Sequence, residues 1–168
     1  HCAGATRSSG NSAKANVLFA RVFDNCPSKS RQSVLSFRYW NDSLFTETLK
    51  SCENQHDSVL VYTIGAYKNS ELNRTSIQTI YSLEPESKYL ELLLFRAISI
   101  LERSVLPIKD PWDGYRTYLT SGYHYTTPLP IDSFLYKTVF KIANENRVSN
   151  SHLWNYAAGY IASLQNNS

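Results

Sequence analysis

Apolar residues recur at helical spacing between Glu84 and Pro107, and this pattern predicts one long helix. Pro85 suits the first turn of such a helix, where its missing N–H is not needed, and Pro107 ends it. Leu92 and Phe95 fall among polar residues on the other side, so we expect the helix to be covered from more than one direction. The apolar stripe itself consists of Leu90, Leu93, Leu94, Ala97, Leu101 and Val105.

Shorter periodic segments predict further helices, over residues 33–40, 44–52, 59–66, 133–143 and 153–164. We expect Phe134 on the inward face of the fourth of these, and Tyr156 and Tyr160 on the inward face of the last. Residues 17–23 fit either a helix or a strand, and residues 69–79 are typical of a loop with one helical turn.

Proline and glycine crowd the region after Pro107, and alternating residues within it predict two short strands. The alternating residues are Tyr115, Thr117 and Leu119, and then Tyr123, Tyr125 and Thr127, with the turn of a hairpin around Ser121 and Gly122. The sequence therefore predicts an α+β fold, largely helical and then briefly β, with an all-α fold as the alternative. We expect a single domain over 1–168, made of a flexible arm (1–13), a helical part (14–106) and a part with short strands and helices (107–168).

The composition of the 168 residues, 42% hydrophobic and 18% charged, is that of a globular protein. A net charge of +3 with dispersed Lys and Arg argues against a nucleic-acid partner, because such proteins usually cluster their basic residues. No apolar run approaches the length that spans a membrane.

Two features favour a secreted protein. The chain contains no Met and begins at His1, as a product of signal-peptide removal would. Glycosylation sequons begin at Asn41, Asn73 and Asn166, and we expect Asn41 and Asn73 to be exposed and glycosylated.

An odd number of cysteines, Cys2, Cys26 and Cys52, leaves at least one without an intramolecular partner. In an oxidising compartment Cys26 and Cys52 are expected to form a disulfide; the alternative is three free or differently paired thiols. Cys2 would then pair with a second chain or with another segment. No Cys/His spacing predicts a metal site.

Three segments of the chain together carry a family resemblance. The long helix contains Lys88-x-Leu90-x-x-Leu93-Leu94-x-Arg96-Ala97-x-x-x-Leu101, the run His56-Asp57-Ser58-Val59-Leu60-Val61-Tyr62-Thr63 precedes it, and Gly114-Tyr115-Arg116 follows it. In this order they resemble the long helix, the segment upstream of it and the opening of the NAD-binding core in the vertebrate-type ecto-ADP-ribosyltransferases, which modify arginine with ADP-ribose from NAD. The resemblance covers roughly residues 17–118, the N-terminal part of such an enzyme.

This resemblance implies an NAD site that includes Arg116 and Tyr115. A guanidinium group matches the diphosphate of NAD in charge and geometry, and an aromatic ring could stack on one of its bases. Thr117 follows Arg116 where the family usually has Gly, which weakens the match. Gly159-Tyr160-Ile161-Ala162-Ser163 faintly resembles the approach to the family's serine strand, but no Glu-x-Glu follows. The catalytic residues therefore stay unassigned.

Two functions are compatible with these observations. The first is a secreted NAD-dependent mono-ADP-ribosyltransferase, incomplete for catalysis in this chain alone. The second is a secreted, non-catalytic helical module that binds a protein partner or acts as an effector.

Overall fold

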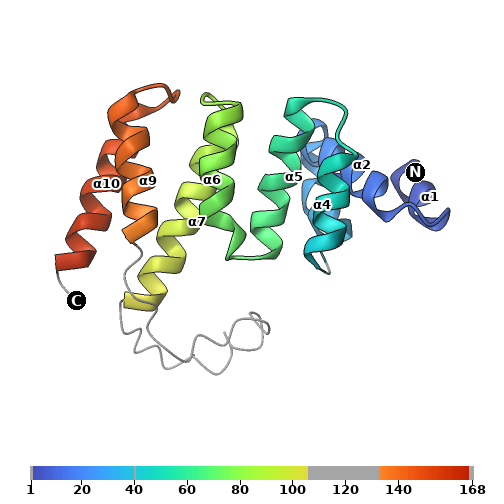
Figure 1. Ribbon diagram of the computed structural model, residues 1–168, viewed down its shortest axis with the longest axis horizontal. Coiled ribbons are helices and arrows are strands. Elements are labelled where there is room, and N and C mark those ends of the chain that lie inside the picture. Colours follow the sequence, from blue (N-terminus) through green and yellow to red (C-terminus); the bar gives the residue numbers. More distant parts are fainter. Residues whose placement is uncertain (1, 40, 106–132, 167–168) are drawn as a thin grey trace. The chain divides into compact units, whose positions relative to one another are not determined.

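The computed structural model describes residues 2–39, 41–105 and 133–166, and every regular element among them is a helix (Figure 1). The α+β prediction is therefore wrong and the all-α alternative is favoured. The two predicted strands fall at 115–127, outside the described residues. A two-stranded hairpin without a sheet to join is marginal, so it was a weak basis for the fold class.

Helices α1 to α6 and the first residues of α7 form one compact unit, His1–Leu93, and Leu94–Ser168 forms a second. The helices of the first unit are α1 (Cys2–Ser8), α2 (Ser12–Asn25), the short 3-10 helix η1 (Pro27–Lys29), α3 (Ser30–Ser36), α4 (Asp42–Lys50), α5 (Gln55–Lys68) and α6 (Leu72–Leu83). Helix α7 (Lys88–Val105) runs through the boundary, and α9 (Ser133–Glu145) and α10 (Ser151–Asn166) belong to the second unit.

Helix α2 lies at the centre of the first unit and contacts α1, α3, α4 and α5. The undecided segment 17–23 is part of this helix, and the expected flexible arm 1–13 contains α1 and the start of α2. Asn16 is buried in α2 and fully used: its Nδ2 donates to the Arg38 carbonyl at 2.8 Å and to Thr48 Oγ1 at 3.2 Å, and its Oδ1 accepts from the Arg38 amide. A buried amide with all these bonds ties α2 to α4 and to the segment after α3.

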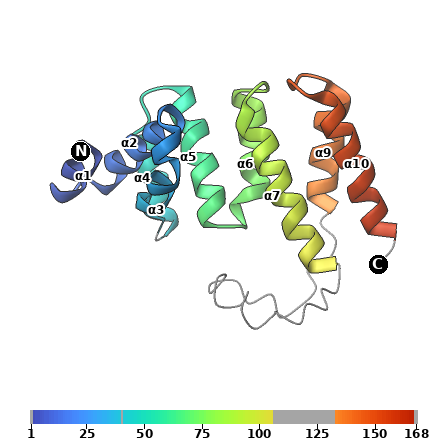
Figure 2. The ribbon, with the colours of Figure 1, turned by 180° about the vertical axis from the view of Figure 1, so that it is seen from behind.

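Helix α5 packs between α2 and α6 and is buried on several sides, with Val59, Leu60, Val61 and Ile64 inaccessible to water. Gly65 permits a close approach by α4. A Cβ placed on it would come within 2.5 Å of the Phe45 ring. The neighbouring α6 replaces the loop expected over 69–79, and it packs side by side with α5 (Figure 2).

In the second unit, α9 and α10 pack against each other along apolar stripes. Asn146 ends α9 in the left-handed region, with φ of 51°, as asparagine often does after a helix. The inward faces differ from those expected: Trp154 is fully buried, whereas Phe134 and Tyr160 are exposed and Tyr156 is 78% exposed. The buried residues of the two helices are Leu135, Thr138, Val139, Ile142, Ala143, Trp154, Ala157, Ala158, Ile161 and Leu164.

Two expectations about single residues are also corrected. Cys26 and Cys52 are free thiols, like Cys2, so the expected disulfide is not formed. Cys26 Sγ instead lies 3.5 Å from Ser28 Oγ, and Cys52 Sγ donates to the Thr48 carbonyl at 3.5 Å. Asn73 was expected at the surface, but it is only 2% exposed, because it lies on the inner face of α6 and its Nδ2 donates to the Leu93 carbonyl.

Candidate functional site

The NAD-site residues expected from the sequence, Arg116 and Tyr115, lie outside the described residues. Ser163 is described, and it lies in helix α10, where its hydroxyl donates to the Tyr160 carbonyl at 2.7 Å. It therefore does not belong to a serine strand. The described residues bring together two other groups of side chains, an ionic cluster in the first unit and an aromatic and basic surface in the second.

The ionic cluster consists of Asp24, His56, Glu84, Lys88 and Tyr89. Asp24 Oδ1 accepts from Lys88 Nζ at 2.8 Å and from the Tyr89 hydroxyl at 2.6 Å. Its Oδ2 lies 3.0 Å from His56 Nε2, and His56 Nδ1 lies 3.0 and 3.1 Å from the two carboxylate oxygens of Glu84. These bonds connect α2, α5, the residue that ends α6 and the first turn of α7.

The pKa values in the cluster favour its charged form. The pKa of His56 is raised by its hydrogen bond to Asp24 and also by Glu84, against an opposing effect of burial. Burial alone would raise the pKa of Asp24, but its bonds to Lys88, Tyr89 and His56 outweigh that effect and hold the pKa well below its usual range. Burial and the contact with Asp24 raise the pKa of the Tyr89 hydroxyl. The raised pKa of His56 favours an imidazolium that bridges two carboxylates, which we interpret as a clamp between helices.

We expect His56→Gln to lower the denaturation midpoint at pH 5–6 more than at pH 9. Because the folded-state pKa of His56 is raised, its contribution to stability is complete below the unfolded-state pKa of about 6.5 and is lost as pH rises through the folded-state pKa. Urea titrations of both proteins across this range measure the difference. Lys50→Gln, at an exposed position of α4, is the control and should show no comparable change. A pH-independent difference for His56→Gln would contradict the proposed ionic clamp.

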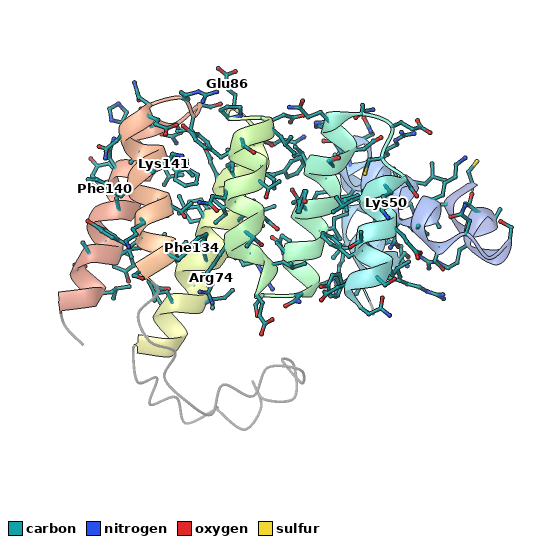
Figure 3. The ribbon with its side chains drawn as sticks, viewed as in Figure 1. Lys50, Arg74, Glu86, Phe134, Phe140 and Lys141 are labelled. Carbon is teal, nitrogen blue, oxygen red and sulfur yellow. The ribbon has the colours of Figure 1, made fainter. Side chains whose placement is uncertain are left out.

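The second group, which we call the α9 face, consists of Tyr136, Lys137, Phe140 and Lys141. The rings of Tyr136 and Phe140 are stacked, with centroids 5.8 Å apart and planes at 28°. Phe140 is 50% exposed, and the next residue, Lys141, is also exposed (Figure 3). Lys137, almost one turn earlier in the helix, is exposed as well. Lys141 also lies 3.7 Å from Glu145 one turn further along the helix.

The amphipathic pattern of α9 explains how these residues reach the surface. Leu135, Val139 and Ile142 are buried on one side, and the helical repeat places Lys137, Phe140 and Lys141 on another. The exposed half of the Phe140 side chain contributes no burial energy to the fold. The stack with Tyr136 supports the ring on one side, and the helical repeat places Lys137 and Lys141 together on its other side.

Neither group of side chains was predicted from the sequence. His56 entered it only as part of a family-like run, and Phe140 was not singled out. A signal for the α9 face was present, since Lys137 and Lys141 mark the outer side of the predicted helix and Phe140 falls between them.

Within residues 2–39, 41–105 and 133–166, no grouping of His, Cys, Asp and Glu could hold a metal ion. Among the same residues, no helix combines the length and apolar character needed to cross a membrane.

No protein-family model, curated protein or solved structure matches this chain. The resemblance to ADP-ribosyltransferases accordingly stays a prediction from the sequence segments that carry it. The described residues establish a helical fold, an ionic cluster that joins α2, α5 and α7, and an exposed aromatic and basic surface on α9.

Proposed function

We propose that this protein is a secreted, non-catalytic helical module that binds an acidic segment of a partner protein through the α9 face. The single observation that carries the proposal is the half-exposed Phe140, stacked on Tyr136 and next to the exposed Lys137 and Lys141. Aromatic side chains held rigidly at a surface are the usual anchors of protein interfaces. The exposed sequon at Asn41 fits an extracellular location.

The chemistry of the α9 face specifies the partner. A ring fixed by stacking loses little conformational entropy on binding, so it favours an apolar residue of the partner directly above it. The side chain of Lys141 is 64% exposed, and together with Lys137 it attracts carboxylates next to that apolar residue. The expected ligand is therefore a short segment with a Leu, Phe or Trp next to acidic residues.

Selection of peptides from a random phage library on the purified chain tests the proposal. We expect the selected peptides to contain an apolar residue next to Asp or Glu, and to bind less tightly at higher salt. Phe140→Ala should weaken the binding of such a peptide about tenfold or more, equivalent to about 1.4 kcal/mol. Phe95→Ala is the matched control, because Phe95 is exposed to a similar extent, 54%, but lies on α7.

Two outcomes would contradict the proposal. The first is selected peptides without acidic residues, or equal effects of Phe140→Ala and Phe95→Ala. The second is binding of NAD by the wild-type chain that Arg116→Ala abolishes, which would favour the ADP-ribosyltransferase hypothesis. Helix formation measured by circular dichroism for each variant separates a loss of binding from a loss of fold.

A further inference from the structure

Helix α10 has an outer face that carries no charge. The whole helix, Ser151–Asn166, contains no Asp, Glu, Lys or Arg. Tyr156 is 78% exposed, an unusual degree for a residue of this size. The exposed residues, which we call the α10 face, are His152, Asn155, Tyr156, Gly159, Tyr160 and Ser163. None of them belongs to the α9 face.

Gly159 is the residue of this face that the fold does not explain. Glycine in a helix costs about 1 kcal/mol relative to alanine. A Cβ placed on Gly159 would meet nothing within 4 Å, and the backbone there does not have the positive φ that requires glycine. Packing within the chain therefore does not require glycine. Because Gly159 has no side chain, it leaves open space on the helix surface beside the exposed Tyr156 and Tyr160. The backbone or a ring of another molecule can approach closely there.

Tyr160 is held in a defined position on the same face. Its hydroxyl donates to Glu102 Oε1 of α7 at 2.6 Å. The ring is thus oriented before any partner arrives, which lowers the entropy lost on association.

We propose that two copies of this chain associate through the α10 face, with the two α10 helices antiparallel about a two-fold axis at the level between Ala157 and Ala158. In such a pair each residue lies opposite the one equally far on the other side of the axis. Tyr156 then faces Gly159 of the other copy, so the most exposed ring fills the site that glycine leaves open.

The same register pairs the remaining residues of the face. Asn155 lies opposite Tyr160, and His152 lies opposite Ser163, so both further pairs join side chains able to form hydrogen bonds. Because the face carries no Asp, Glu, Lys or Arg, the copies meet without the like-charge repulsion that a charged helix would impose on itself. This self-complementarity favours a second copy over an unrelated partner. The proposal does not depend on the function proposed for the α9 face.

Sedimentation equilibrium of the whole chain over a wide concentration range, in reducing buffer so that Cys2 cannot link chains, is the test. We expect a reversible monomer–dimer equilibrium for the wild type. Gly159→Leu should raise the dissociation constant at least about tenfold. It should keep the helical content, since the added side chain meets nothing in its own chain. Phe140→Ala, on α9, is the control that should still dimerise.

A charge-pair experiment tests the register. Tyr156→Glu and Gly159→Lys should each be monomeric alone and should form a heterodimer when mixed, because the new Glu and Lys then face each other while the second Tyr156–Gly159 pair is intact. A wild-type chain that stays monomeric at every concentration overturns the proposal. So does a dimer that Gly159→Leu leaves unchanged, and a mixture of the two charged variants that stays monomeric overturns the register.

Discussion

Leu94→Ala is expected to lower the free energy of unfolding by about 2–5 kcal/mol. Leu94 lies on the apolar stripe of α7 and is completely inaccessible to water. Truncation removes its buried apolar atoms and leaves a cavity that tightly packed neighbours fill only in part. Urea denaturation followed by circular dichroism measures the change.

The adjacent residue provides the control for this prediction. Phe95 follows Leu94 in α7 but is 54% exposed, so Phe95→Ala should destabilise the protein much less, even though it removes more atoms. Equal effects of the two substitutions would show that the stripe of α7 has been assigned to the wrong side.

Arg21→Leu is expected to destabilise the protein by about 3 kcal/mol at neutral pH. Arg21 forms a two-pronged ion pair with Asp57, with Nε–Oδ1 and Nη2–Oδ2 distances of 2.8 and 2.7 Å. The Asp57 side chain is only 3% exposed, so the loss of Arg21 leaves a buried carboxylate without its cation. We place the effect at the lower end of the usual range because the Arg21 side chain is 33% exposed and water can reach the site.

The pH dependence of this substitution has a definite sign. The hydrogen bond from Arg21 lowers the pKa of Asp57, so the ion pair stabilises the fold above the unfolded-state pKa of about 3.9 and the contribution disappears as pH falls through the folded-state pKa. The difference between wild type and Arg21→Leu should therefore be large at pH 7 and shrink below about pH 4. Urea denaturation of both proteins at pH 7 and below about pH 4 measures this difference in stability.

Glu53→Gln is the matched control. Glu53 Oε2 also lies 2.6 Å from Arg21 Nη2, but its side chain is 65% exposed, and exposed pairs contribute about 0–1 kcal/mol. A comparable loss of stability in Glu53→Gln and Arg21→Leu would contradict the view that the buried carboxylate makes the difference.

Periodicity predicted the long helix well because its apolar residues repeat over many turns. Leu90, Leu93, Leu94, Ala97 and Leu101 are buried as expected. We also expected other parts of the protein to cover the opposite side of this helix, but this expectation is wrong at Phe95, which is 54% exposed. Helical spacing shows which residues share a face, whereas the number of neighbouring helices depends on the rest of the fold.

A loop was expected over 69–79, where the structure has helix α6, because buried polar residues obscure the helical pattern in the sequence. Helix α6 buries Asn73 and Ser76 together with Ile77 and Ile80. The first two look like surface residues in the sequence, so the apolar repeat is incomplete. For the same reason, the sequon at Asn73 was wrongly expected to lie at the surface.

The fold class and the candidate site were the least predictable features. The α+β prediction depended on the alternation of residues 115–127, and the described residues are all helical. To predict the α9 face, one would need to know which side of α9 is covered by other helices. To predict the ionic cluster, one would need to know that α2, α5 and α7 meet. Asp24 and Lys88 are far apart in the chain, and nothing local in the sequence pairs them.

The sequence by itself determined the long helix and most of the other helices, because helix formation depends on local spacing and capping. Only the tertiary structure decided the orientation of α10. The expected and the observed inward faces share Ala157, Ile161 and Leu164, so helical spacing alone allows either Tyr156 and Tyr160 or Trp154 and Ala158 to complete the face. Packing against α9 selected the face with the large indole and small alanines, and so left the tyrosines at the surface.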